Sequence, residues 1–148
     1  MTLQELKLFP KFSAKEITDT GANIAGIDYY SFKCLNSFRI EINRGVYFQE
    51  DGINSGAHDS KQHPEGKAFD IYFNEKHGAI TYEVIKQYFY IALACGFRRI
   101  GIYWNGKMYS MHLDTGPEYG FWIAAKGNKI KSWVYKPFLN DPKKITGV

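Results

Sequence analysis

Two short stretches of the sequence carry side chains that could bind a metal ion. In the first, Ser60–Ile71, the imidazole of His63 and the carboxylate of Asp70 stand on either side of a turn. The second, Met111–Asp114, contains His112. Catalytic zinc sites commonly use three protein ligands, among which His and Asp are ordinary types, and keep a fourth position for water. His63, Asp70 and His112 therefore form a candidate set of three zinc ligands.

The chain around these residues is expected to form two strands, Lys67–Phe73 and Lys107–Asp114. Successive side chains of a strand point to opposite faces, so each candidate ligand shares its face with every second residue. If the two strands are neighbours, Asp70 and His112 converge on one face. His63 then completes the triangle from the loop that precedes the first strand.

These residues resemble the zinc D-Ala-D-Ala carboxypeptidases and related peptidoglycan peptidases, which share a fold with the hedgehog signalling domain. The family pattern is Ser-x-His-x-x-Gly-x-Ala-x-Asp, followed by a His in a later strand. The block 101–116 is similar to the family's C-terminal block, and the resemblance covers roughly residues 9–123. Four positions match the first pattern at the family's spacing: His63, Gly66, Ala68 and Asp70.

Three positions depart from the family pattern. The serine stands three residues before the first histidine, at Ser60, rather than two. Many relatives have an aromatic residue and then an Arg that binds a substrate carboxylate, where this chain has Ala57 and His58. Tyr109 stands three residues ahead of His112, where many relatives have a Glu that acts as the general base.

The resemblance implies a zinc-dependent peptidase that cleaves stem peptides or cross-links of peptidoglycan, as an endopeptidase or a D-Ala-D-Ala carboxypeptidase. The missing Arg favours the endopeptidase. Asp114, two residues beyond His112 on the same strand face, is the candidate catalytic base. Alternatively, Asp114 orients a ligand histidine through its ring N–H. His58, Ser60 and Tyr103 are candidate substrate-binding residues.

The sequence also predicts the surroundings of several other aromatic, histidine and cysteine residues. Trp104 and Trp122 are expected to wall the cleft together with Tyr103. His77 is expected to be solvated at the start of a helix. Cys34 and Cys95 are expected to be buried free thiols, because two cysteines in a chain of this size do not make a disulfide scaffold.

The composition is typical of a globular chain. At 148 residues the sequence fits a single domain over 1–148, with an expected C-terminal tail from about 136. It is 45% hydrophobic, 17% aromatic and 23% charged, and its formal net charge of +4 would favour approach to an anionic polymer without giving specificity. No dense basic run with interleaved aromatic residues indicates nucleic-acid binding.

We recognise no export signal in the sequence. The first ten residues lack a basic start followed by an apolar run, and no window approaches the roughly 18 apolar residues of a membrane span. We therefore expect synthesis in the cytoplasm without a signal peptide and no membrane insertion. A wall-directed enzyme of this kind would act after release, as a phage lysin does, or as part of a virion. Nothing in the sequence indicates the oligomeric state.

The expected fold is α+β, a small mostly antiparallel sheet with two main helices on one side and the zinc site on the open face. A short helix is expected over 14–18, and the main helices over about 28–43 and 78–96. Beyond the two strands named above, strands are expected at 46–49, 98–104, 119–124 and 129–135, with a hairpin turn at Asn105-Gly106.

Two alternative functions remain open. The first is a zinc-binding module without catalysis, a structural component of a virion or of the wall, which the absence of the Glu base favours. The second is a zinc hydrolase that acts on a different small peptide or amide. Wall hydrolysis distinguishes the first alternative from the peptidase, and a panel of D- and L-peptides distinguishes the second.

Overall fold

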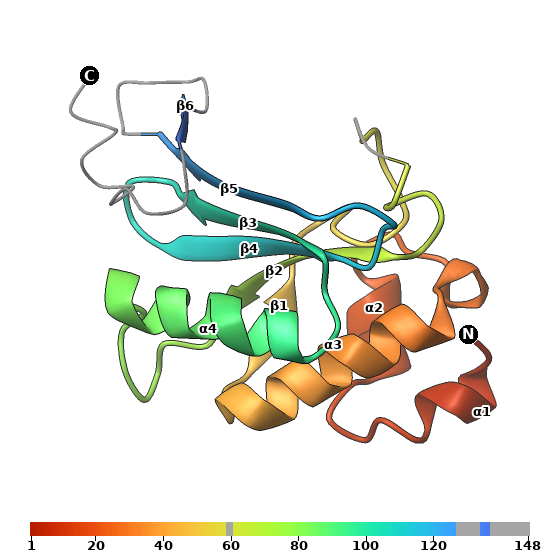
Figure 1. The fold of residues 1–148 in the computed structure, drawn as a ribbon. Helices are drawn as coiled ribbons and strands as arrows, with labels where there is room; N and C mark the ends of the chain where they lie inside the picture. Colours follow the sequence, from red (N-terminus) through yellow and green to blue (C-terminus); the bar gives the residue numbers. More distant parts are fainter. Residues whose placement is uncertain (59–60, 127–133, 137–148) are drawn as a thin grey trace.

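The computed structural model describes residues 1–58, 61–126 and 134–136. Its centre is a six-stranded sheet in the order β1-β2-β4-β3-β5-β6. Two long helices, α3 and α4, cover one face of this sheet, and the opposite face is open (Figure 1). The strands are β1 Val46–Phe48, β2 Ala68–Phe73, β3 Arg99–Trp104, β4 Tyr109–Asp114, β5 Gly120–Ala125 and β6 Val134–Lys136.

The predicted α+β fold class is confirmed. Every strand pairing in the described sheet is antiparallel except that of β3 with β5, which is parallel. The predicted hairpin joins β3 to β4, and the side chain of Asn105 caps its turn by accepting hydrogen bonds from the backbone N–H groups of Lys107 and Met108. The residues expected to form a C-terminal tail, apart from Lys136 at the end of β6, lie outside the described part of the chain.

The two main helices begin at side-chain caps. Asp28 caps α3 (Tyr29–Ile42) by accepting a hydrogen bond from the Ser31 backbone N–H. Thr81 does the same for α4 (Tyr82–Ala94), so this helix starts four residues later than predicted from Gly78. The segment before the cap forms turns instead, and His77 is exposed there, outside the helix.

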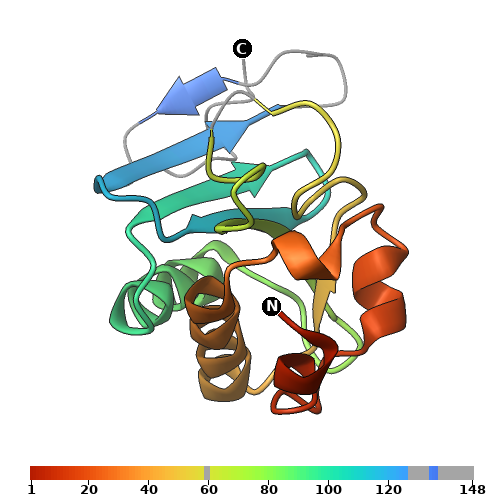
Figure 2. The same ribbon diagram turned by 90° about the vertical axis from the view of Figure 1, so that its right-hand side faces the viewer.

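The N-terminal segment adds three short elements beside α3 (Figure 2). The helix α2 (Ala14–Thr18) was predicted, whereas α1 (Leu3–Leu6) and the 3-10 turn η1 (Ile24–Gly26) were not. Both α1 and α2 begin with a capping box, in which a Thr or Ser and a Glu cap one another's backbone N–H groups. The buried rings of Phe9 and Phe12 pack on Phe32 of α3, so this segment extends the core of the sheet and helices.

The structure also tests the expectations for the two cysteines and for a membrane-spanning helix. Cys34 and Cys95 are both free, as predicted, but only Cys34 is buried, because Cys95 is the C-terminal cap of α4 and is partly exposed. Within the described residues, no helix has the length and apolar character needed to cross a membrane.

Gly66 fixes the loop that carries His63 against the N-terminal segment. Its φ of 71° lies in the left-handed region, and its carbonyl accepts a hydrogen bond of 3.0 Å from the Asp28 backbone N–H. A Cβ at this position would stand 2.0 Å from the Gly26 carbonyl oxygen. Glycine is therefore required here for two separate reasons, conformation and space.

We expect Gly66→Ala to lower the free energy of unfolding by about 2–5 kcal/mol, the sum of left-handed strain and overpacking. Gly78→Ala is the matched control, since Gly78 also has a positive φ but its nearest non-neighbouring atom would be Arg44 Nη2, 3.5 Å from the added Cβ. The control should carry only the backbone cost, about 1–3 kcal/mol. Urea denaturation measures both values, and a Gly66→Ala cost no larger than the control's would contradict the steric argument.

Candidate metal centre

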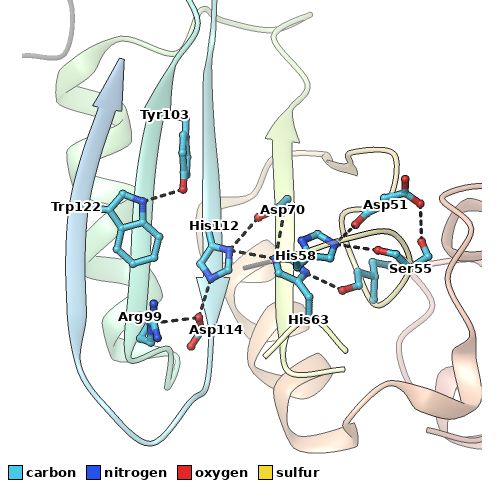
Figure 3. Close-up of polar contacts among 11 residues, drawn as sticks. Asp51, Ser55, His58, His63, Asp70, Arg99, Tyr103, His112, Asp114 and Trp122 are labelled. Atoms are coloured by element: carbon cyan, nitrogen blue, oxygen red, sulfur yellow. Dashed lines mark hydrogen bonds and ion pairs between the residues drawn. The ribbon is translucent and has the colours of Figure 1, made fainter. Parts of the chain in front are cut away.

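The predicted convergence of Asp70 and His112 is confirmed by the pairing of β2 with β4. The two residues are directly opposite one another in the register, and both side chains stand on the open face of the sheet (Figure 3). His112 Nδ1 lies 2.9 Å from Asp70 Oδ1. The third residue, His63, reaches the pair from the loop before β2, with Nε2 3.3 Å from His112 Nδ1 and 3.3 Å from Asp70 Oδ2.

The spacing of these donor atoms fits a tetrahedral ion. Zinc bonds of about 2.0–2.2 Å to nitrogen and oxygen place any two ligand atoms of a tetrahedron about 3.3–3.5 Å apart. Here His112 Nδ1 lies 3.3 Å from His63 Nε2 and 2.9 Å from Asp70 Oδ1, and His63 Nε2 lies 3.3 Å from the other carboxylate oxygen, Asp70 Oδ2. An ion could therefore be held by all three side chains with only small side-chain movements.

The remaining ring nitrogens hold the histidines in the tautomers that metal binding needs. His63 Nδ1 lies 2.7 Å from the carbonyl oxygen of Ile53, which can only accept, so Nδ1 carries the proton. His112 Nε2 lies 2.7 Å from Asp114 Oδ2 and donates to that carboxylate. When both rings are neutral, the lone pairs of His63 Nε2 and His112 Nδ1 therefore point toward each other and toward Asp70.

The pKa values of Asp70 and His112 are shifted by their contacts with each other and with their neighbours. Burial by itself raises the pKa of Asp70, but hydrogen bonds from His112 and His63 outweigh it and hold that pKa well below its ordinary value. Burial lowers the pKa of His112, yet hydrogen bonds to Asp114 and Asp70 outweigh burial and raise it. These shifts favour the ionised form of Asp70 and the protonated form of His112, so positive charge beside the Asp70 carboxylate is stabilising.

Asp114 lies behind the site rather than in the cavity. Its side chain is completely buried, with Oδ2 accepting from His112 and Oδ1 accepting from the Gly116 backbone N–H at 3.0 Å. Arg99 Nε lies 3.6 Å from the same Oδ2. A base must reach the water whose proton it takes. This geometry favours the orienting role for Asp114 over the role of catalytic base, although both remain predictions.

His58 lies against the site but is poorly directed for ligation. Donor atoms of His58, His63 and Asp70 come within 4.8 Å of one another, so these three residues form an alternative metal-binding group. However, the rings of His58 and His63 are stacked, with centroids 3.8 Å apart and planes 15° apart. An ion in the plane of the His63 ring therefore lies out of the plane of the His58 ring, where His58 has no lone pair.

The hydrogen-bonding contacts of the His58 ring are made by Nε2 and point away from the candidate ion site. Its Nε2 lies 2.8 Å from the carbonyl oxygens of both Asp51 and Ser55 (Figure 3). These contacts and the stacking anchor the 50–58 loop against His63. His112 is the better candidate for the third ligand, because its Nδ1 is in hydrogen-bonding range of donor atoms on both His63 and Asp70.

A cavity of about 820 Å³ opens in front of the candidate ligands. Tyr103 and Trp122 line it as predicted, and Trp122 Nε1 donates a hydrogen bond of 2.8 Å to the Tyr103 hydroxyl. Trp122 lies flat on the sheet because Gly101 has no side chain; a Cβ there would stand 2.4 Å from the indole. The prediction for Trp104 is wrong, because this residue does not line the cavity and packs instead on Tyr109 and the core.

The described lining of the cavity extends over four strands and the loop before β2. His58, a predicted substrate-binding residue, is part of this lining. Ser60, the other candidate from the same loop, lies outside the described residues. The lining residues are Gln49, His58, His63, Asp70, Tyr72, Arg99, Tyr103, Asn105, Met108, Ser110, Met111, His112, Trp122 and Lys126.

Sequence reasoning missed two contributors to the site. Ile53 supplies a backbone carbonyl, which no side-chain pattern can indicate. Arg99 was assigned only to a strand, although the alternation of β3 places it on the face of Gly101 and Tyr103, away from the buried Ile100 and Ile102. That alternation is the signal that could have identified it.

A scan against protein-family models and searches of curated proteins and of solved structures returned no match.

Proposed function

We propose that this protein is a zinc-dependent peptidase that cleaves peptide bonds in the stem peptides or cross-links of bacterial peptidoglycan. The observation that carries the proposal is the convergence of His63, Asp70 and His112, in which the two ring nitrogens lie 3.3 Å apart and each lies 2.9–3.3 Å from one carboxylate oxygen of Asp70, a spacing that suits a tetrahedral ion. The sequence pattern around these residues supplies the substrate class, through its resemblance to peptidoglycan peptidases.

The chain's own residues would divide the work as follows. His63, Asp70 and His112 would hold the ion, while Ile53 and Asp114 keep the two rings in the ligating tautomers. Bound zinc would polarise a peptide carbonyl and lower the pKa of a water molecule toward neutrality. The stacked His58 ring and the aromatic wall of the cavity would orient an extended peptide across the open face.

A zinc-binding module without catalysis is a second candidate, favoured by a specific observation. Asp70 is the only carboxylate among the described residues that line the cavity, and Asp114 is buried behind His112. A hydrolase needs a group that accepts the proton of the attacking water. A structural component of a virion or of the wall needs only the metal centre.

The test is the release of new amino groups from purified peptidoglycan by zinc-loaded protein. We expect release by the wild-type chain and loss of release in His112→Ala. Tyr47→Phe is the matched control, since Tyr47 is exposed on β1 and is not among the lining residues. Zinc content is measured for every variant, so that loss of metal is separated from loss of chemistry.

The possible outcomes separate the candidates. One bound zinc per chain without any cleavage would refute the peptidase for this substrate and favour the non-catalytic module. Cleavage of a panel of L-peptides in preference to D-containing peptides would favour a zinc hydrolase with a different small peptide or amide as its substrate. Cleavage that survives His112→Ala would show that the metal centre is not responsible.

A further inference from the structure

We infer that Arg99 is a specificity-determining residue that binds a carboxylate of the peptide substrate beside the metal centre. This inference rests on the proposed function for the reaction but adds the chemical class of substrate. Three observations support it: the position of Arg99 on the sheet, the hydrogen-bond donors of its guanidinium that are not used within the described residues, and the charges of the residues that line the cavity.

Arg99 stands on the same face of the sheet as the candidate ligands. In the register of β3 with β4, Gly101 is opposite His112 and Arg99 is opposite Asp114. Arg99 is therefore two residues along the strand from the level of His112, roughly 7 Å. An extended peptide advances about 3.3–3.6 Å per residue. A group one or two residues beyond a carbonyl held at the metal centre would thus come within reach of Arg99.

The guanidinium of Arg99 contacts Asp114 and Trp122 on the protein side and is open toward the cavity. Its Nε is 3.6 Å from Asp114 Oδ2, and its Cζ is 5.7 Å from the centroid of the Trp122 ring. These two contacts set its direction (Figure 3). The side chain is 35% exposed, and Nε has no hydrogen-bond partner within the described part of the protein.

The terminal NH₂ groups of Arg99 suit a planar anion. No hydrogen bond joins them to any of the residues that the structure describes. A guanidinium offers parallel N–H donors in a rigid plane, which match the two oxygens of a carboxylate. Asp114, which lies 3.6 Å from Nε, attracts the guanidinium from one side and leaves this outer edge unused.

The charge of the cavity favours an anionic ligand. Among its described lining residues, the cations are Arg99 and Lys126 and the only carboxylate is Asp70. Asp70 is itself engaged by His112 and His63. A divalent ion at the centre would make the cavity more positive still. The chemistry recognised is a carboxylate, either the C-terminal α-carboxylate of a peptide or the side chain of an acidic residue.

The experiment measures binding, so that it does not depend on turnover. Zinc-loaded and metal-free protein are titrated with four N-acetylated dipeptides: Ala-Ala with a free C-terminus, Ala-Ala amide, Ala-Glu amide and Ala-Gln amide. Calorimetry gives the affinities, and the ¹⁵N resonance of the Arg99 Nε reports contact. We expect one of the two carboxylate peptides to bind about 10–100-fold more tightly than its uncharged counterpart, and this pair identifies the source of the carboxylate.

Three variants assign the preference to its residue. Arg99→Gln should remove the preference, and Arg99→Lys, which retains the charge beside Asp114 but lacks the fork, should lose most of it. Arg98→Gln should retain it, because the neighbouring Arg98 contacts the Pro117 carbonyl and the Tyr119 ring and does not line the cavity.

Equal binding of acid and uncharged peptides by the wild-type protein would overturn the inference, as would a preference that persists in both Arg99 variants. Binding with this preference by a protein that releases no amino groups from peptidoglycan would contradict the proposed peptidase while supporting the role of Arg99. The experiments therefore distinguish an error in the proposed peptidase activity from an error in the proposed role of Arg99.

Discussion

Replacing His112 by alanine is expected to weaken zinc binding by about 100-fold or more. Zinc binding by four protein ligands in small domains is worth about 10–16 kcal/mol, or roughly 3 kcal/mol per ligand, which corresponds to about two orders of magnitude in affinity. The His112 ring also joins Asp70 to Asp114, with distances of 2.9 and 2.7 Å. Removing it leaves Asp114 as a buried carboxylate without its main donor.

His58→Ala is the matched variant for this prediction. His58 and His112 both have rings in contact with His63, but only His112 directs a lone pair toward the other two donors. We expect His58→Ala to lower the zinc affinity far less than His112→Ala does, because it removes the ring stacking and the loop contacts but none of the three candidate ligands. Competition with a chromophoric zinc chelator measures both affinities, and circular dichroism of the metal-free proteins shows whether they fold.

The reverse result would change the assignment of the ligands. A large loss in His58→Ala together with a small loss in His112→Ala would mean that His58, His63 and Asp70 bind the ion. Such a result would require the His58 ring to leave its stacked position and its contacts with the Asp51 and Ser55 carbonyls.

Asp114→Asn is expected to lower the zinc affinity by about 10–100-fold, the usual cost of losing a group that orients a ligand histidine. The Asp114 carboxylate accepts from two donors, the His112 ring and the Gly116 backbone N–H. An amide has only one oxygen. If that oxygen stays with Gly116, the amide NH₂ faces His112 Nε2 and moves the ring proton to Nδ1, the atom that the ion needs.

The same variant separates the two roles considered for Asp114. If Asp114 orients His112, peptidoglycan cleavage by Asp114→Asn should recover substantially once zinc is saturating. If Asp114 is the base, cleavage should stay lost while zinc remains bound with unchanged affinity. Asp51→Asn is the control, because the Asp51 carboxylate accepts from the Ser55 hydroxyl and contacts no candidate ligand. A normal zinc affinity in Asp114→Asn would contradict the orienting role.

Most of the fold was predictable because its signals are local. Strand-forming runs of residues identified β2, β3 and β4, and the Asn105-Gly106 turn identified the hairpin that pairs β3 with β4. The predicted start of α4 was less accurate. The apolar periodicity does not show that the helix begins at Tyr82, after the Thr81 cap, rather than at Gly78. The element α1 was missed because its four residues are too few for a periodic pattern.

The sequence by itself determined the three candidate ligands, since the spacing of His63 and Asp70 around Gly66 and the alternation around His112 are short-range patterns. Only the tertiary structure decided the surroundings of the site: the burial of Asp114, the stacking of His58, the Ile53 carbonyl and the open edge of Arg99. The physical reason is that periodicity reports which way a side chain points within its own element. Strand order, register and loop packing then determine which atoms from distant segments lie within hydrogen-bonding distance, and the role proposed for each group depends on these contacts.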